Sequence, residues 1–451
     1  MPFIIPANSA LASGGYNVAN SCKFNAGSSD YLSRTFGSGN RKTWTWSAWI
    51  KLANINSSSE VIFGRLTANN DSSWFTVDIR GNDKITIGIY NTNYLITNRL
   101  FRDTSAWYHI VVAFDTTQGT ANNRVRLYIN GVEETSFATR NNPSQNFDAP
   151  LNANVQHLLG KSYSSYYEGY MSEVTFIDGQ QLAPTDFGEF DEDSGVWKPI
   201  DVSGLTFGTN GFYLDFEDSS ALGNDANGSN NWTANNLTAV DQSTDTCTNN
   251  FATANPLANL VGSPTYSEGN LEVTGNSSAN HNWQSTIGVS SGKWYWEMKS
   301  LASSPDTGLL FYDQSIAPVN SPGAGFGTLQ RQKIVNSAAT GSAIGSTAQN
   351  DIHGMALDLD NGKMFIHRNG TYLLSGDPAN GTNPFIVTAD GLATEGVFGG
   401  YTYDGTVQLN FGNPAFAISS GNADGDGFGN FEYAPPSGFF ALCTKNLAEY
   451  G

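Results

Sequence analysis

Apolar and polar side chains alternate in short stretches along most of this chain. The segment 125–131, Val-Arg-Leu-Tyr-Ile-Asn-Gly, places apolar residues at every second position before an Asn-Gly pair. The segment 294–299, Trp-Tyr-Trp-Glu-Met-Lys, also alternates. A period of two is typical of a β-strand with one buried face. Residues 107–114 are mostly apolar, which suits a fully buried strand. The pattern therefore predicts an all-β protein.

The segment 354–373 gives the most specific local prediction, which is three antiparallel strands joined by two Asn-Gly turns. Both central residues of a type I′ turn need positive φ, and the Asn-Gly pair meets this need. With a two-residue turn at 361–362, Leu359 faces Met364 on the apolar side of the hairpin. A second turn follows at 369–370. His367 is expected on the polar side, at the surface.

The same signals divide the chain into four parts. Residues 1–20 are rich in small and polar residues and are expected to form an N-terminal arm, whereas 21–190 carry repeated strand signals. Few strand signals occur in 191–264, which we interpret as an irregular connector between two domains, with one or two strands near Phe212 to Phe216. Strand signals resume in 265–451, a second β domain that is expected to end in an extended cover strand at 431–440.

Composition narrows the classes of function. Charged residues make up 14% of the 451 residues and aromatic residues 12%, a mixture that favours many short strands over helical bundles. With 22 basic and 41 acidic residues, the formal net charge is -19, which repels phosphate backbones and speaks against nucleic-acid binding. No apolar run approaches the length of a membrane span, so we expect no membrane insertion.

The N-terminus and the cysteines indicate a protein made in a reducing cytoplasm. No Lys or Arg precedes Lys23, and two prolines interrupt the first apolar run, so we expect no signal peptide. Cys22, Cys247 and Cys443 lie far apart and lack the spacing of a metal site. We expect free thiols, with neither a disulfide framework nor a zinc site.

Four segments of the first domain, at 41–50, 107–114, 125–131 and 169–176, contain short motifs in a characteristic order. These motifs are Trp-Ser-Ala-Trp-Ile, Trp-Tyr-His-Ile, Leu-Tyr-Ile-Asn-Gly and Gly-Tyr-Met-Ser-Glu-Val. In this order the domain resembles the laminin-G/concanavalin-A-like lectin superfamily. The resemblance implies a two-sheet, jelly-roll-type β-sandwich.

The second domain carries four further motifs, at 292–298, 354–363, 365–370 and 409–412. They read Gly-Lys-Trp-Tyr-Trp-Glu-Met, Gly-Met-Ala-Leu-Asp-Leu-Asp-Asn-Gly-Lys, Phe-Ile-His-Arg-Asn-Gly and Leu-Asn-Phe-Gly. Their order resembles that of SPRY domains. SPRY domains are also β-sandwiches and bind partners through loops at one end, so the resemblance implies a second sandwich of this kind.

The pair of domains is similar to virion proteins of marine tailed bacteriophages, such as tail fibres and receptor-binding proteins. The resemblance implies a homo-oligomer that contacts other virion proteins and a host surface glycan or protein. Such a protein is made in the host cytoplasm and reaches the outside by lysis, which agrees with the expected lack of a signal peptide.

Catalytic patterns are weak in this chain, so we expect no enzyme. Glycosidases of the jelly-roll fold place carboxylates in an E-x-D-x-x-E pattern, but the nearest run, 189–193, is followed by Ser194 and lacks the final Glu. A hydrolytic triad needs a nucleophile motif beside a histidine, and none occurs. His109 lies within an apolar run and is expected to be a hydrogen-bonded core residue.

Calcium remains an open alternative to a protein without cofactors. Laminin-G-like domains often hold one calcium ion near a sandwich edge. The candidate ligands are carboxylates in two polar segments: Asp215, Asp218, Asp225, Asp424 and Asp426. Neither group fits the spacing of an EF-hand loop, and aspartate is also common in turns.

Tyrosines flanked by Gly and Ser are the strongest candidates for a binding surface. They lie in two segments and comprise Tyr163, Tyr166, Tyr167, Tyr401 and Tyr403. Rigid rings on small-residue loops give contact area at a low cost in entropy. The alternative is that these rings pack between domains or subunits.

The sequence thus leads to one hypothesis and two alternatives. The hypothesis is a non-enzymatic virion surface protein of the tail-fibre or receptor-binding type, which engages host glycan or protein through loops. The first alternative is a structural capsid or tail decoration protein that contacts mainly other virion subunits. The second is a glycan depolymerase.

Overall fold

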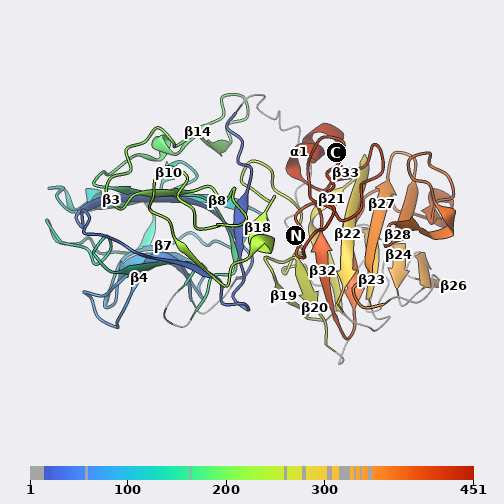
Figure 1. The fold of residues 1–451 in the computed structure, drawn as a ribbon, viewed down its shortest axis with the longest axis horizontal. Coiled ribbons are helices and arrows are strands. Elements are labelled where there is room, and N and C mark those ends of the chain that lie inside the picture. Colours follow the sequence, from blue (N-terminus) through green and yellow to red (C-terminus); the bar gives the residue numbers. More distant parts are fainter. Residues whose placement is uncertain are drawn as a thin grey trace. The chain divides into compact units, whose positions relative to one another are not determined.

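The computed structural model describes residues 15–55, 59–161, 163, 165–258, 262–276, 281–301, 307–313, 326–329, 332–335, 338–343 and 348–451. These residues form two compact units, which meet in sequence between Thr248 and Asn249. We call them the first unit and the second unit, and Figure 1 shows both. Most of the predicted N-terminal arm, residues 1–14, lies outside the described residues.

The first unit contains two antiparallel sheets, each of eight strands among the described residues. In the first sheet, β16 (Phe212–Leu214) pairs with β13, and the other strands have the order β10 (Val132–Glu133), β9 (Val125–Ile129), β8 (Trp107–Asp115), β3 (Thr43–Leu52), β13 (Gly169–Asp178), β1 (Ser21–Phe24) and β18 (Gln242–Ser243). The second sheet has the order β11 (Phe137–Arg140), β7 (Thr92–Thr97), β6 (Ile85–Ile89), β5 (Trp74–Arg80), β4 (Ser59–Leu66), β12 (Gln156–Leu159), β2 (Tyr31–Thr35) and β17 (Thr233–Asn235).

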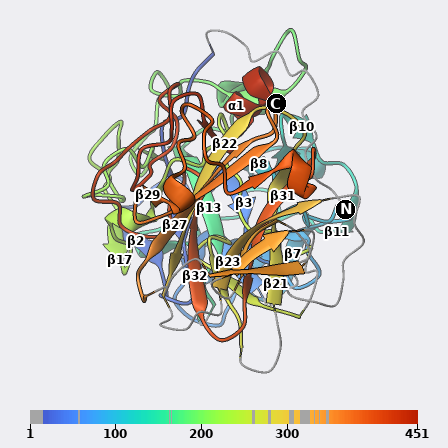
Figure 2. The same ribbon diagram turned by 90° about the vertical axis from the view of Figure 1, so that its right-hand side faces the viewer.

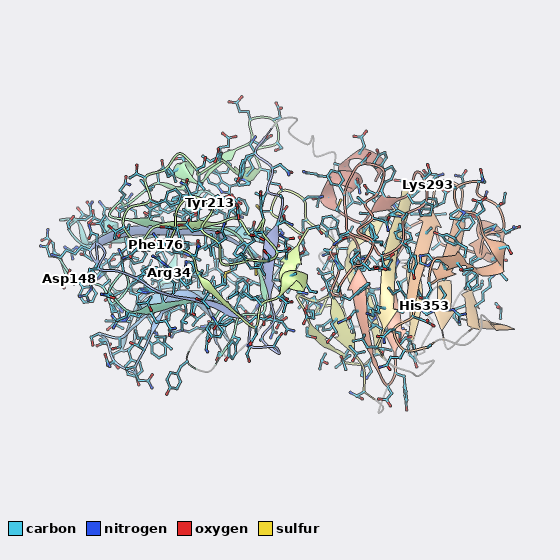
Figure 3. All side chains as sticks on the ribbon, in the orientation of Figure 1. Arg34, Asp148, Phe176, Tyr213, Lys293 and His353 are labelled. Atoms are coloured by element: carbon cyan, nitrogen blue, oxygen red, sulfur yellow. The ribbon has the colours of Figure 1, made fainter. Side chains whose placement is uncertain are left out.

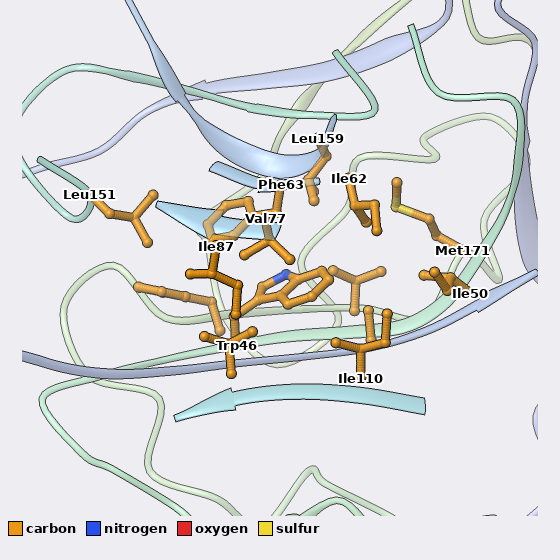
Figure 4. Packing of buried hydrophobic residues seen from close by; sticks show 14 of the residues in the cluster. Trp46, Ile50, Ile62, Phe63, Val77, Ile87, Ile110, Leu151, Leu159 and Met171 are labelled. Carbon is orange, nitrogen blue, oxygen red and sulfur yellow. The ribbon is translucent and has the colours of Figure 1, made fainter. Parts of the chain in front are cut away.

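The core of the first unit lies between these two sheets. Figure 4 shows Trp46, Ile50, Ile110 and Met171 from the first sheet facing Ile62, Phe63, Val77 and Ile87 from the second. Trp44 and Trp46 are both fully buried, and they lie on the same face of β3 because side chains alternate along a strand. The predicted alternation in this strand therefore builds the core.

The second unit is also a pair of sheets, which are antiparallel apart from one short parallel pairing between residues 294–295 and 440–441. In the larger sheet, β30 (Ile386–Val387) pairs with β28 and β33 (Phe440–Ala441) with β22, while the main order is β19 (Thr265–Ser267), β20 (Glu272–Thr274), β32 (Thr406–Asn410), β22 (Lys293–Ser300), β27 (Ile352–Asp358), β28 (Lys363–Arg368) and β29 (Thr371–Tyr372). The smaller sheet has the order β21 (His281–Val289), β31 (Gly396–Thr402), β23 (Thr307–Asp313), β24 (Phe326–Leu329), β25 (Gln332–Val335) and β26 (Ala338–Ala343).

Tryptophans from the two sheets of the second unit pack against each other. Figure 2 shows the strands of these sheets. Trp296 from β22 and Trp283 from β21 are fully buried and meet edge to face, with ring centroids 5.9 Å apart. The predicted fold class is confirmed, since both units are β-sandwiches of mainly antiparallel sheets.

Helices are few and short among the described residues. The α-helix is α1 (Thr444–Tyr450), and the 3-10 helices span Ala121–Asn123, Pro184–Asp186, Ala239–Asp241, Leu373–Ser375 and Thr388–Asp390. In the described part of the chain, no helix has the length and apolar character that a membrane crossing requires.

Residues 191–264, which were predicted to be a connector, have a different role in the structure. A short ribbon, formed by β14 (Gly188–Phe190) and β15 (Trp197–Pro199), opens this part of the chain. Further along, β16 pairs with β13, β17 with β2 and β18 with β1, so these strands belong to the first unit. The first unit therefore extends well past residue 190, the boundary that strand signals predicted. A strand was expected near Phe212, where β16 lies, but the other strands of two or three residues carry too little alternation to be recognised in sequence.

The central hairpin of the second unit is present, but its register differs from the prediction. Leu357, not Leu359, faces Met364, because a four-residue loop separates β27 from β28. The Asp358 carboxylate accepts hydrogen bonds from the backbone and side-chain nitrogens of Asn361, at 3.0 and 2.9 Å. This side-chain bonding favours the longer loop over a type I′ turn. The second turn is as predicted, since Asn369 and Gly370 both have positive φ between Arg368 and Thr371.

His367 was expected at the surface of this hairpin, but it is buried. The rings of Tyr372 and Tyr433 pack edge to face against it, at centroid distances of 5.2 and 5.3 Å. Tyr433 comes from the C-terminal segment predicted as a cover strand, which is irregular apart from β33. The polar side of the hairpin is covered by residues that are distant in sequence, and alternation within the hairpin does not reveal them.

The turn at Gly370 provides a test of this packing. Gly370 has a φ of +77°, and a Cβ atom there would lie 2.8 Å from the Tyr433 ring. Gly370→Ala is therefore expected to lower the free energy of unfolding of the second unit by about 1–2 kcal/mol. Chemical denaturation measures this. The control, Gly425→Ala, should have little effect, because Gly425 lacks positive φ and the new Cβ atom would lie 3.9 Å from the Phe440 ring, an ordinary contact distance. Equal effects of the two changes would contradict the account.

Candidate functional site

Two of the five predicted tyrosines are fully buried, and this corrects their assignment as ligand-binding residues. The Tyr167 hydroxyl donates to the backbone oxygen of Lys51 at 3.0 Å, and its ring packs against Phe24. Tyr401 lies within β31, in a cluster with Leu310 and Tyr312, and Tyr403 packs partly against this cluster. The rings of Tyr167 and Tyr401 therefore face the interior of the fold, which the Gly- and Ser-rich flanks did not reveal.

The structure instead brings Tyr31, Tyr166 and Lys161 together in the first unit, with Tyr163 in the same short segment as Lys161 and Tyr166. Tyr163 has 70% of its surface exposed, and Tyr166 is partly exposed. The ring of Tyr166 lies 6.2 Å from that of Tyr31, which the sequence did not single out. The Lys161 ammonium lies over the Tyr31 ring, 3.9 Å from its centroid. We call Tyr31, Lys161, Tyr163 and Tyr166 the Tyr31 patch.

Strand pairing positions this patch. Tyr31 begins β2, and its neighbour Leu32 points into the core, so the Tyr31 side chain lies on the outer face of the second sheet. The chain leaves β12 through Gly160, and an antiparallel bridge then pairs Lys161 with Tyr166. Tyr163 lies between these two residues in sequence. The bridge holds two members of the patch at a fixed separation.

A second aromatic pair lies elsewhere in the first unit. Trp74 and Tyr90 have ring centroids 5.4 Å apart, and Tyr90 is 45% exposed. The indole nitrogen of Trp74 donates to Thr76 at 3.2 Å, which fixes the ring within the sheet. No lysine or arginine is stacked on these rings among the described residues. The pair offers a matched aromatic surface that lacks the charge of the Tyr31 patch.

His109 is buried, as the sequence predicted, and its hydrogen bonds exclude a role as a base toward Ser47. The indole N–H of Trp197 donates to His109 Nδ1 at 2.9 Å, so Nδ1 is an acceptor. Nε2 must then carry the hydrogen and donate to Ser47 Oγ, 2.8 Å away. Burial lowers the pKa of His109 to about 3, so the ring stays neutral.

The motif Gly-Tyr-Met-Ser-Glu-Val contains a buried carboxyl group, that of Glu173. Glu173 lies in a β-bulge of β13 and has a φ of +53°, and its two oxygens accept from the Tyr213 hydroxyl at 2.9 and 2.8 Å. The Tyr16 hydroxyl lies 2.9 Å from that of Tyr213. In Figure 3, Tyr213 lies on the outer side of the first sheet and Phe176 between the sheets. Burial raises the pKa of Glu173 to about 8.

The second unit holds a comparable buried carboxyl group. Glu297 in β22 accepts from the backbone nitrogens of Glu432 and Tyr433 and from the side chains of Tyr295 and Asn410. Burial raises its pKa to about 7. The group has no exposed face and ties the irregular C-terminal segment to the sheet, so we assign it a structural role.

The calcium candidates all accept hydrogen bonds from the surrounding protein. Asp225 accepts from the backbone nitrogens of Tyr213 and Asn230 at 3.0 and 2.9 Å, and Asp424 from those of Phe428 and Ala441, both at 2.9 Å. Each of the remaining three carboxylates has a hydrogen-bond donor nearby: Asp215, Asp218 and Asp426. Within the described ranges, no three acidic, histidine or cysteine side chains are grouped as a metal site.

Comparisons with known proteins place the first unit among lectin-like folds. A family model described as the concanavalin A-like lectin/glucanases superfamily matches residues 26–183, a segment that includes the whole Tyr31 patch. No curated protein sequence matches the chain.

Solved structures give distant similarities. The SPRY domain of human HERC1 is 14% identical, with a TM-score of 0.29, covering 35% of this chain and 96% of that domain. A putative carbohydrate binding protein from Bacteroides ovatus is 17% identical, with a TM-score of 0.34, covering 49% of this chain and 59% of that protein. A SAP-like pentraxin from Limulus polyphemus is 15% identical, with a TM-score of 0.29, covering 38% of this chain and 80% of the pentraxin chain. Over residues 26–183, this chain is thus similar to the concanavalin A-like lectin/glucanases superfamily.

Proposed function

We propose that this protein is a non-enzymatic surface protein of a tailed-bacteriophage particle that binds a host-surface glycan through the Tyr31 patch. The observation that carries the proposal is the pair of rings of Tyr31 and Tyr166, 6.2 Å apart, together with Tyr163, which is 70% exposed and lies between Lys161 and Tyr166 in sequence. The flat C–H face of a sugar ring packs well on an aromatic ring, and a polar rim supplies hydrogen bonds. The lectin-like match over the same segment supports a glycan as the ligand.

Location on a phage particle would make a shallow patch effective. One patch offers few contacts, so a single copy is expected to bind weakly. Many copies on one particle, in a homo-oligomer that also contacts other virion proteins, raise the effective concentration and hence the overall avidity. The resemblance of the two-domain chain to phage fibre proteins supports this location.

The test compares host-cell binding of the purified protein with that of Tyr163→Ala/Tyr166→Ala. We expect this double substitution to weaken binding at least about tenfold, the effect of losing about 1.4 kcal/mol of contact energy. Tyr90→Ala is the matched control, since Tyr90 is also exposed in the first unit, and it should bind normally.

Two results would count against the proposal. If the double variant bound host cells and blocked phage adsorption as well as the wild type, the patch would not be the binding site. If the protein bound only other particle proteins, a decoration role would be favoured instead. Release of reducing sugars from host polysaccharide would indicate a depolymerase.

A further inference from the structure

We infer that the Tyr31 patch selects an anionic glycan, whose sugars carry carboxylate or sulfate groups. This inference rests on the proposed glycan-binding function and adds the chemical class of the ligand. It comes from Lys161, whose ammonium lies 3.9 Å from the centroid of the Tyr31 ring and 5.2 Å from that of Tyr166. The patch therefore joins a fixed positive charge to the rings that would carry the sugar.

The two rings hold the ammonium in place before any ligand arrives. A lysine side chain has four rotatable bonds in its stem, and immobilising it on binding costs about 0.5–1.5 kcal/mol. Here the cation–π contacts with two tyrosines, together with the bridge between Lys161 and Tyr166, already limit its freedom. An ammonium prepared in this way loses less entropy when an anion binds to it.

The charge of Lys161 is not neutralised by an ion pair among the described residues. Two acidic side chains near it in sequence or across the strand face other partners. Asp30 accepts from the backbone nitrogen of Asn25 at 3.0 Å, and Glu168 from that of Ala26 at 2.7 Å. Lys161 is partly exposed, so its remaining N–H groups are directed to solvent or to a ligand.

The geometry favours an acidic sugar over a neutral one. The ammonium covers the Tyr31 ring at 3.9 Å and lies 5.2 Å from the centroid of the Tyr166 ring, so a sugar ring that packs on Tyr166 brings its substituents close to the ammonium. A carboxylate or sulfate among those substituents would form a charge-assisted hydrogen bond, which is about twice as strong as a neutral one.

The net charge of -19 opposes the approach of an anionic polymer, but only at long range. At about 0.15 M salt the Debye length is about 8 Å, so distant carboxylates are largely screened. A direct contact with Lys161 is shorter than this distance and persists. We therefore expect binding to be measurable at moderate salt and weakest at very low salt.

The experiment measures binding of the full chain to three immobilised polysaccharides: carboxylated alginate, sulfated carrageenan and neutral laminarin. We expect binding to alginate or carrageenan that exceeds binding to laminarin. Lys161→Gln should weaken it about tenfold, whereas Lys161→Arg, which keeps the charge, should stay within about threefold of the wild type. Lys84→Gln, a partly exposed lysine of the same unit, is the control and should have no effect.

The outcomes separate this inference from the proposed function. If laminarin bound best, or if Lys161→Gln bound the acidic polymers normally while Tyr163→Ala/Tyr166→Ala did not, the glycan-binding function would stand and the anionic selectivity would be overturned. Absence of binding to both acidic polymers would also overturn the inference. If host-cell binding were unaffected by the tyrosine changes as well, the proposed function would fail independently.

Discussion

Replacing Asp245 with alanine is expected to lower the free energy of unfolding of the first unit by about 3–5 kcal/mol. Its carboxylate forms an ion pair with Lys51 at 2.7 Å, and both side chains are almost completely buried, at 0% and 1% exposure. The same carboxylate accepts from the indole nitrogen of Trp107 at 3.1 Å. Removing it leaves the Lys51 ammonium in a low-dielectric interior without its carboxylate, and this is the physical cause of the loss.

The position of Asp245 gives this prediction its structural meaning. Asp245 follows β18, in the part of the chain that the sequence indicated as a connector. A large loss of stability would show that the segment around Asp245 contributes to the free energy of unfolding of the first unit. The control is Glu133→Ala, because Glu133 faces Arg126 at 3.9 Å in a partly exposed pair, and the substitution should cost less than about 1 kcal/mol. Similar, small effects in urea denaturation of both variants would contradict the account.

The second large effect concerns Glu173 and the pH dependence of stability. Burial raises the pKa of Glu173 from 4.5 to about 8, so the folded chain holds this proton more tightly than the unfolded chain. The resulting stability is fully present below pH 4.5 and is lost as the pH rises through about 8. At about 1.4 kcal/mol for each pKa unit, the loss amounts to about 3–5 kcal/mol.

Glu173→Gln should remove most of this dependence. The amide has the shape of the protonated carboxyl group and no charge to desolvate, so the variant should exceed the wild type in stability at alkaline pH. Urea denaturation between about pH 5 and pH 9 measures the difference. Burial also raises the pKa of Glu297 to about 7, so this residue makes the stability of the second unit depend on pH in the same direction. That part of the pH dependence should remain in the Glu173→Gln variant. Parallel pH profiles of wild type and Glu173→Gln would contradict the assignment.

Local sequence signals predicted the parts of the fold that local chemistry determines. The turns at Asn130-Gly131 and Asn369-Gly370 have positive φ at both residues, as the Asn-Gly pair requires. Alternation in β3, β9 and β22 identified strands whose apolar faces form the two cores.

Features that depend on distant partners were not predictable in this way. The four-residue loop after Asp358 depends on the donors that hydrogen-bond to its two carboxylates. Asp358 accepts from the backbone nitrogen of Asn361, and Asp360 accepts from that of Gly292 at 2.8 Å. The short strand β17 exists because β2 offers an open edge to it. Such pairing is a property of the assembled sheet.

The candidate site shows the same division. Tyrosine-rich loops pointed to Tyr163 and Tyr166, but the pattern could not distinguish them from Tyr167, which is buried one residue later. Tyr31 is separated from Lys161 by the greater part of the first unit, and only the pairing of β2 with β12 brings them together. A lysine stacked between two tyrosines is therefore a feature of the fold that no single segment encodes.

The central claim is that a glycan occupies the Tyr31 patch, and a crystal structure of the full chain with a bound host oligosaccharide tests it most directly. The account predicts a sugar ring packed on Tyr166, with an acidic substituent within hydrogen-bond distance of Lys161 Nζ. A sugar bound instead at Trp74 and Tyr90, or on the second unit with the Tyr31 patch empty, would contradict it.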